Sequence, residues 1–171
     1  MSVLSDAESS QFREIYDTTY RSVHKYVTRR ISDEVDDLVE DTYITAWRRR
    51  ESIPIEAEER LLWIYGIARR LIANRLRLRS RRSRFVREFG PLNHEAPSTE
   101  SAAVASVIVH SALGKMRQRD REILLLVEWE GLTLHQAAQV LGVAPTTATK
   151  RLATARERFK AFCGSVKVPT P

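Results

Sequence analysis

Apolar residues recur every three or four positions along most of this chain, and no segment keeps the strict alternation that a β-strand would show. The pattern predicts a long first helix that ends near Arg30, a second helix after Ser32, and a third that runs from about residue 57 past residue 76. The sequence is therefore expected to fold as an all-α protein. The first helix should bury a face made of Phe12, Ile15, Tyr16, Val23, Tyr26 and Val27.

The second predicted helix is strongly acidic on one side. Ser32 can cap its start, and Asp33 and Glu34 would then lie in its first turn, where the helix dipole favours negative charge. Its apolar side comprises Val35, Leu38, Val39, Tyr43, Ala46 and Trp47. The remaining carboxylates cannot be buried with that side, so they should form an exposed acidic surface that is either simply solvated or binds a basic partner. They are Asp36, Asp37, Glu40 and Asp41.

The third predicted helix mixes aromatic residues with arginines. Rings stack on unpaired bases at about 1 to 3 kcal/mol each while arginines follow the phosphate backbone, so the mixture is typical of single-strand binding. Trp63 fits a helical core equally well, and both interpretations stay open. The inward side should comprise Leu61, Ile64, Ala68, Leu71 and Ile72. Around it lie Trp63, Tyr65, Arg69, Arg70, Asn74, Arg75 and Arg77.

A polar stretch with two prolines interrupts the helical pattern over residues 90–99 and is typical of a linker. We therefore expect two small helical domains joined by a flexible linker, the second ending in a helix-turn-helix. The first domain should cover residues 1–87, the linker residues 88–101 and the second domain residues 102–171.

Two helices are expected in the second domain before that motif. The apolar pattern over residues 102–116 predicts the first, with Val104, Val107, Ile108 and Leu113 as its apolar residues. The next, over about residues 119–130, is strongly apolar in its middle and should end at Gly131.

Local signals of a helix-turn-helix follow. Thr133 and Gln136 have the spacing of a capping box, in which each side chain accepts from the other residue's backbone N–H, so a helix should start at residue 134. Gly142 can end that helix in the left-handed conformation. Pro145 suits the first position of the next helix, because its fixed φ is helical and its missing N–H would have no partner there.

The last helix has an apolar stripe and an opposite face of hydroxyls and cations. The stripe comprises Ala148, Leu152, Ala155, Phe159 and Phe162. The polar face carries no carboxylate before Glu157, which suits a helix that enters the major groove, where Arg and Lys donate to guanine edges and phosphates. An amphipathic helix with an ordinary solvated basic face is the alternative. The polar face comprises Thr146, Thr147, Lys150, Arg151, Thr154 and Arg158.

Charge is unevenly distributed along the chain. Its net charge is +6, yet the second helix is acidic while residues 69–87 hold nine arginines and no acid. Such a division indicates two partners, one basic and one a polyanion. The single cysteine, Cys163, excludes an internal disulfide, and no Cys/His cluster has zinc spacing. We expect a cytoplasmic protein without metal, cofactor, catalytic residues or membrane insertion.

The ordered set of segments over residues 12–162 resembles the extracytoplasmic-function sigma factors, small two-domain bacterial transcription initiation factors. Residues 36–42, with the Ala46-Trp47 pair, resemble the family segment that docks on the clamp helices of RNA polymerase. Residues 63–69 resemble the segment that opens and reads the minus-10 promoter element. Residues 131–156 resemble the part that binds the minus-35 element.

The resemblance implies a role for each group of residues. Core RNA polymerase would be bound by Asp36, Asp37, Glu40 and Asp41. The opened minus-10 strand would be captured by Trp63, Arg69, Arg70, Asn74 and Arg77, with the loop over residues 51–56 as a weak candidate for shaping the base pocket. Duplex minus-35 DNA would be read by Thr146, Thr147, Lys150, Arg151, Thr154 and Arg158. An anti-sigma factor that covers these surfaces is also implied.

The chain departs from the family pattern at several contact positions. Arg70 and Asn74 stand where the family usually has Asn and then Asp, and Gln136 stands where Glu is usual. Ala144 replaces a common capping Ser and Thr146 a usual Gly. These differences concern which promoter is read more than the function itself.

Two other functions fit part of the sequence. A stand-alone helix-turn-helix regulator with an N-terminal dimerisation or sensor module explains residues 133–158 equally well, but leaves the acidic helix without a role. An RNA-binding or nucleic-acid-processing enzyme lacks any metal-ligand or acid–base constellation in the sequence.

Overall fold

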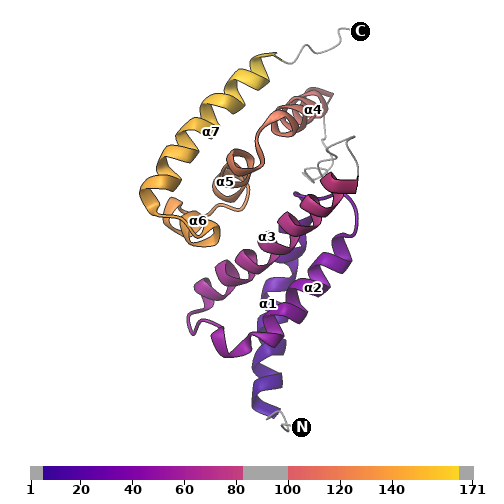
Figure 1. The fold of residues 1–171 in the computed structure, drawn as a ribbon, viewed down its shortest axis with the longest axis vertical. Helices are drawn as coiled ribbons and strands as arrows, with labels where there is room; N and C mark the ends of the chain where they lie inside the picture. The colour runs from indigo at the N-terminus through magenta and orange to yellow at the C-terminus, as the bar shows by residue number, and fades with distance from the viewer. Residues whose placement is uncertain (1–5, 83–99, 166–171) are drawn as a thin grey trace. The chain divides into compact units, whose positions relative to one another are not determined.

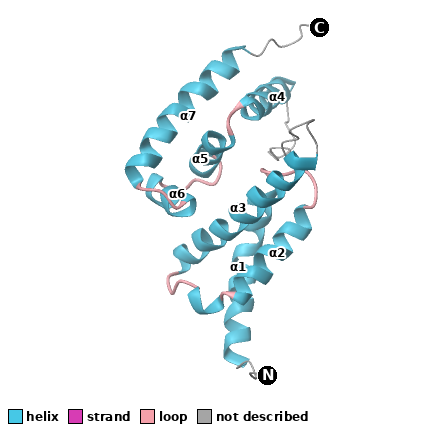
Figure 2. Cartoon of the chain, viewed as in Figure 1, coloured by secondary structure: helices cyan, strands magenta, loops and turns pink. Residues whose placement is uncertain are grey.

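The computed structural model describes residues 6–82 and 100–165 of the chain. Its compact units are Met1–Val86 and Arg87–Pro171. Helices are the only regular elements among the described residues, as Figures 1 and 2 show, which confirms the all-α fold in two helical parts. The predicted linker falls almost entirely outside the described residues, so its flexibility stays a prediction.

Three helices that pack on one another form the first unit: α1 (Asp6–Thr28), α2 (Val35–Arg48) and α3 (Ala57–Arg82), with a short 3-10 helix η1 (Arg50–Ser52) between the last two. The predicted faces are confirmed at most positions. The core of the unit includes Ile15, Val23, Tyr26, Val27, Leu38, Val39, Ala46, Ile64, Ala68 and Ile72. Tyr16 was predicted to be buried, but it is 39% exposed because it lies at the edge of the α1–α2 packing.

Stacked aromatic rings join α1 to α3. The rings of Tyr26 and Tyr65 lie 4.5 Å apart at an interplanar angle of 18°, and both residues are buried. Arg30 covers the other face of the stack, with its guanidinium carbon 3.5 Å from the Tyr26 ring centroid, and it donates a 2.9 Å hydrogen bond to the Tyr26 carbonyl. The prediction that Tyr65 lies among the outward arginines is therefore wrong, because this ring completes the core.

The start of α2 differs from the prediction. Ser32 does not cap the helix; its hydroxyl donates to the Asp33 carboxylate at 3.1 Å, and the N-cap is Glu34, which has φ 58° and ψ 31° and makes no side-chain cap bond. Ile31 is fully buried, so the chain must turn sharply before α2 begins, and the left-handed residue makes that turn. The first-turn acids are therefore Asp36 and Asp37.

The second unit contains α4 (Glu100–Lys115), α5 (Gln118–Glu128), α6 (Leu134–Leu141) and α7 (Pro145–Ser165), and α7 packs on the other three. Of the apolar residues of α4, Leu113 is buried, whereas Val107 is 66% exposed. The predicted end of α5 is slightly late: the helix ends at Glu128, and Gly131 takes its positive φ of 69° in the loop beyond.

Both caps of α6 agree with the local sequence signals. The Gln136 N–H donates to the Thr133 hydroxyl at 3.2 Å, and the Thr133 N–H donates to the Gln136 side-chain oxygen at 2.9 Å, so the capping box is confirmed. Gly142 has φ 65° and ψ 41°, and Pro145 is the first residue of α7. The short turn between the two helices is therefore fixed by backbone chemistry at both ends.

Two ion pairs tie α7 to α5, and they differ in burial. Asp120 is 2% exposed and pairs with Arg158, while the Arg119 guanidinium lies 3.6 Å away. Arg156 donates to Glu128 at 2.7 Å, and about half of each of those side chains is exposed. Losing Arg158 should therefore cost more than losing Arg156, because it would leave the Asp120 carboxylate buried with only Arg119 nearby.

Replacing Thr133 by Ala should destabilise the second unit by about 1 kcal/mol, because it removes the N-cap acceptor of α6. The measurement is urea-dependent hydrogen exchange of peptides from α5 and α6. Thr149→Ala is the matched control: this threonine is exposed inside α7 and donates only to the Pro145 carbonyl, so its loss should be neutral or slightly stabilising. Equal effects of the two substitutions would contradict the assigned role of the capping box.

Arg158→Ala should destabilise the same unit by about 2 to 3 kcal/mol, because it leaves the buried Asp120 carboxylate with only its more distant arginine. Arg156→Ala removes an arginine of the same helix from an exposed pair and should cost about 0 to 1 kcal/mol. The same exchange measurement compares them. A smaller loss for Arg158→Ala than for Arg156→Ala would show that the buried pair does not hold α7.

Candidate functional site

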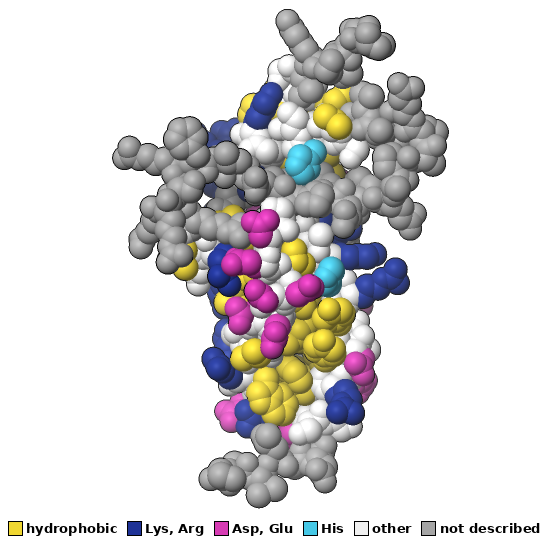
Figure 3. Space-filling view, turned by 90° about the vertical axis from the view of Figure 1, so that its right-hand side faces the viewer, with side chains coloured by type: hydrophobic (Ala, Val, Ile, Leu, Met, Phe, Trp, Pro, Cys, Tyr) yellow, Lys and Arg dark blue, Asp and Glu magenta, His cyan; other side chains and the backbone are white. Residues whose placement is uncertain are grey.

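Carboxylates gather on the outer face of α2. Asp36, Asp37, Glu40 and Asp41 are all exposed, as predicted, while Leu38 and Val39 on the opposite side are buried. His24 of α1 lies 3.3 Å from the Asp36 carboxylate. Figure 3 shows acidic side chains gathered on this part of the first unit, next to a patch of apolar ones. The geometry therefore allows a basic partner to contact the four carboxylates together.

An aromatic groove of about 590 Å³ borders the acidic surface, between α1 and α2. Tyr16, Tyr20 and Ile44 are 39%, 37% and 39% exposed along it, and Asp36 and Glu40 belong to its lining. The sequence prediction missed this groove, although Tyr16 and Tyr20 are four residues apart on one helix. An exposed apolar groove with a carboxylate edge is suited to a helix that carries both apolar and basic side chains.

Tyr43 forms the floor of the groove. It is 5% exposed, its ring lies 4.6 Å from that of Tyr16, and its hydroxyl shares a 2.9 Å hydrogen bond with Thr19. Burial raises the pKa of the Tyr43 phenol well above its ordinary value, outweighing the opposite effect of the Thr19 hydrogen bond. Partial burial, with Tyr20 close by, also raises the pKa of Tyr16. The groove therefore presents neutral phenols near pH 7, and its negative charge comes from the carboxylates.

Most of the α3 residues predicted to bind the opened strand share one face of the helix. Trp63, Arg70, Asn74 and Arg77 are spaced by seven, four and three residues, so they follow one another along the axis, whereas Arg69 points to a different side. Arg70, Asn74 and Arg77 are exposed, and Arg77 donates to the Asn74 side chain. Trp63 is only partly exposed, so the structure leaves open both interpretations of this residue.

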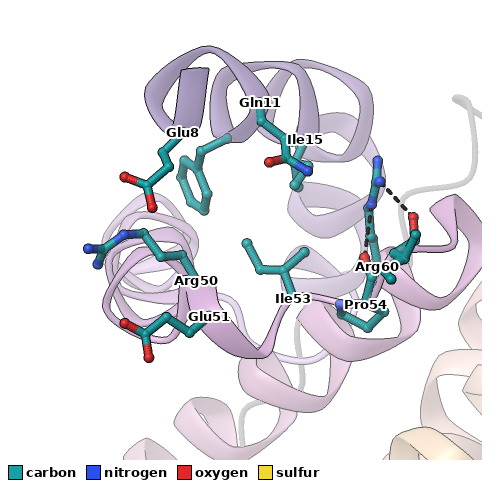
Figure 4. Close-up of a pocket in the computed structure, with 10 residues that line it drawn as sticks. Glu8, Gln11, Ile15, Arg50, Glu51, Ile53, Pro54 and Arg60 are labelled. Atoms are coloured by element: carbon teal, nitrogen blue, oxygen red, sulfur yellow. Dashed lines mark hydrogen bonds between the residues drawn. The ribbon is translucent and has the colours of Figure 1, made fainter. Parts of the chain in front are cut away.

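Figure 4 shows a smaller cavity of about 230 Å³ where the loop before α3 meets α1. Ile53 points into it, and Glu8, Arg50 and Glu51 lie along its edge. Arg60 holds the loop in place by donating to the carbonyls of Pro54 at 3.1 Å and Ile55 at 2.6 Å. The predicted pocket-shaping loop is thus well supported by hydrogen bonds, while its contact with a base stays a prediction.

The polar face of α7 is exposed at four of its six predicted positions. These are Thr146, Thr147, Lys150 and Thr154, and Arg151 is partly exposed. Ala148, Leu152 and Ala155 are buried, so this face must point away from α5 and α6. Arg158 pairs with the buried Asp120, and its guanidinium therefore has a structural task inside the unit; contact of this residue with DNA stays a prediction.

Within residues 6–82 and 100–165, no three His, Cys, Asp or Glu side chains are arranged to hold a metal ion. Cys163 is partly buried, which raises the pKa of its thiol. No helix of those two ranges is both long enough and apolar enough to cross a bilayer.

Two regions of the chain match known sequence families. Residues 15–82 match the family described as Sigma-70 region 2, and residues 106–159 match Sigma-70, region 4. The first match covers α1 from Ile15 onward and all of α2 and α3, and the second includes the helix-turn-helix.

Curated relatives and a solved structure agree with these matches. The ECF RNA polymerase sigma factor SigL of Mycobacterium tuberculosis is 27% identical over 152 residues, which cover 85% of each chain. The RNA polymerase sigma factor NccH of Alcaligenes xylosoxydans is 29% identical, over 79% of this chain and 76% of the relative. The structure of the sigma factor RpoE in complex with the anti-sigma factor NepR, from Bartonella quintana, has a similar fold, with a TM-score of 0.70, 21% identity and coverage of 92% of this chain and 99% of that one. With both sigma regions present in the expected order, this chain belongs to the extracytoplasmic-function sigma factors.

Proposed function

We propose that this sigma factor binds core RNA polymerase through its acidic helix, captures the opened minus-10 strand with α3 and reads the minus-35 element with α7. The observation that carries the proposal is the separation of charge between helix faces. The outer face of α2 presents Asp36, Asp37, Glu40 and Asp41 and no cation before Arg48, whereas the described outer faces of α3 and α7 present arginine, lysine and hydroxyl groups. One chain thus offers distinct surfaces to a basic protein and to nucleic acid.

Polymerase binding would use the groove together with the carboxylates. Apolar contact contributes roughly 25 cal/mol for each Å² removed from water, so the exposed parts of Tyr16, Tyr20 and Ile44 supply affinity that the charges alone would not. Exposed charges mainly steer encounter and orient the partner. A helix of the polymerase that carries apolar and basic residues would therefore lie along the groove with its cations toward Asp36 and Glu40.

An anti-sigma factor would compete for the same surfaces. The related RpoE of Bartonella quintana was solved with an anti-sigma factor, and the exposed groove offers such a partner an apolar site. Occupation of the groove by a regulator would prevent polymerase binding by direct exclusion, without any change of fold.

The minus-10 proposal depends on the face shared by Trp63, Arg70, Asn74 and Arg77. Unstacking and unpairing a base costs a few kcal/mol, and stacking on an aromatic ring returns about 1 to 3 kcal/mol. Stacking on one ring, together with contacts from several cations, therefore supplies enough free energy to hold one or two bases of a strand that the polymerase keeps open. Asn74 adds an amide that can donate to or accept from a base edge.

The minus-35 proposal depends on the exposed start of α7. The residues near the N-terminus of a recognition helix reach base edges, and Thr146, Thr147, Lys150 and Arg151 lie in its first two turns. Lys150 and Arg151 can donate to guanine or to phosphates, and the threonines offer small adaptable contacts. The capped turn before Pro145 fixes the direction in which these side chains leave the unit.

The first test adds the purified chain to core RNA polymerase, measures association, and scores transcription from a library of genomic promoters. Asp37→Lys and Asp41→Lys should each weaken polymerase association roughly tenfold at low salt, because each reverses a charge that faces a basic surface. Binding of duplex minus-35 DNA should be unchanged. Glu14→Lys, an exposed reversal on α1, is the matched control and should leave association unaffected.

The stand-alone regulator makes a different prediction in this test. Tight binding of promoter duplex by the free chain, together with no association with core polymerase, would favour the regulator and remove the sigma function. If the α2 reversals and Glu14→Lys reduced association equally, the acidic helix would not be the surface that binds polymerase. The proposal that the chain binds polymerase would be unaffected by that result.

Lys150→Ala and Arg151→Ala should each weaken binding of the polymerase complex to minus-35 duplex. A base contact is worth about 1 to 3 kcal/mol and its loss relaxes sequence preference, whereas a phosphate contact lowers the salt slope by about 1. Lys160→Ala is the control, since Lys160 is exposed on α7 more than two turns beyond Lys150. Affinity, preference and salt slope that all stay at wild-type values would remove this face from the interface.

A further inference from the structure

Arg49 lies at the junction between the acidic helix and the loop that leads to α3. It is the C-cap of α2, and its backbone N–H is held by the carbonyls of Thr45 at 3.2 Å and Ala46 at 3.1 Å. Its side chain is exposed and extends over the Trp63 ring of α3, with the guanidinium carbon 5.9 Å from the ring centroid. A fixed backbone with an exposed, flexible side chain is thus placed beside a partly exposed indole.

The distance between the two groups is larger than that of a closed stack. In the same unit, the Arg30 guanidinium lies 3.5 Å from the Tyr26 centroid, so the gap over Trp63 is wider by 2.4 Å, the difference between 5.9 and 3.5 Å. A planar base needs about 3.4 Å on each side, the separation of stacked bases in DNA, or about 6.8 Å in all. Moving the exposed Arg49 side chain outward by at least about 1 Å, the difference between 6.8 and 5.9 Å, would therefore admit one base between guanidinium and indole.

Space for a strand continues along α3 next to this gap. A Cβ atom at Gly66 would meet no atom within 4 Å, so no side chain fills the position one turn beyond Trp63. Arg70 and Asn74 follow on the same face and are exposed. Glycine inside a helix costs roughly 0.5 to 1 kcal/mol relative to alanine, and nothing in the backbone at this position requires it. The open position leaves room for a sugar or phosphate between the stacking site and the next cation.

We propose that Arg49 and Trp63 form a two-sided stacking site for one unpaired base of single-stranded DNA, with Arg49 on the face opposite the indole. The inference rests on the proposed function of α3 and adds a residue from α2 to it. Arg49 then has two contributions: cation–π attraction that holds its guanidinium near the ring before binding, and planar stacking on the base afterwards. Lysine cannot replace it, because an ammonium group is not planar.

The test uses the full chain with core polymerase and a fluorescein-labelled non-template-strand oligonucleotide from a promoter that the wild-type complex transcribes. A single abasic site is moved through the minus-10 element of this oligonucleotide. Arg49→Ala should weaken binding about two- to fivefold, and Arg49→Lys should weaken it nearly as much, at one fixed ionic strength. With the abasic site at one particular position, both substitutions should leave the binding affinity unchanged, because the base that Arg49 would stack on is missing. Arg21→Ala, an exposed arginine of α1, serves as the control and should bind as wild type does.

Trp63→Leu is the second variant and keeps an apolar side chain at the partly buried position. It should weaken binding about fivefold or more, and adding Arg49→Ala to it should cause little further loss, since both residues would contact the same base. Wild-type binding by Arg49→Lys, or a loss that persists at every abasic position, would show a phosphate contact only and overturn the proposal. Failure of the wild-type complex to bind any such oligonucleotide would instead remove the proposed minus-10 function, and this inference with it.

Discussion

Tyr26 stacks on Tyr65 under the buried guanidinium of Arg30, and this contact fixes the rotation of α3 in the first unit. Successive residues of an α-helix differ by about 100° in direction, so the residue nine positions after an inward Tyr65 points directly outward. That residue is Asn74, and Arg70 and Arg77 lie within about 60° of the same outward line. The strand-binding face of α3 is therefore a consequence of what the helix buries.

The same reasoning applies to α7, with different chemistry. Buried Ala148, Leu152 and Ala155 are small or apolar and let the helix lie close to its neighbours, which turns Lys150 and Thr154 outward. Asp120 and Arg158 add a buried ion pair near the other end of the helix. Breaking this pair leaves the buried Asp120 carboxylate with only the more distant Arg119, so the pair opposes sliding and rotation of α7. In both units, interior contacts decide which side chains reach a partner.

Features set by a few neighbouring residues could be predicted from the sequence, and features set by tertiary packing could not. The capping box of Thr133, the left-handed Gly142 and the position of Pro145 depend only on local backbone chemistry. Ser32 is an equally good local cap, yet the chain uses Glu34 in a left-handed turn. From the sequence alone, a tyrosine at position 65 could equally be an exposed ring that stacks on bases. It is buried because Tyr26 of α1 packs against it. The aromatic groove was missed for the same reason, because Tyr16, Tyr43 and Ile44 come together only when α1 meets α2.

The acidic and basic surfaces of the first unit are joined mainly by its core. Arg75 of α3 lies 3.4 Å from the Glu34 carboxylate at the start of α2. Both side chains are more than a third exposed, so the pair contributes little, in the range of about 0 to 1 kcal/mol. The packing of α2 on α3 is extensive and apolar. Because close-packed cores transmit strain and have low compressibility, we expect it to change little when an exposed surface is occupied. A partner on α2 would therefore position α3 at the opened strand as a rigid part of the same body, without having to change the affinity of α3 for DNA.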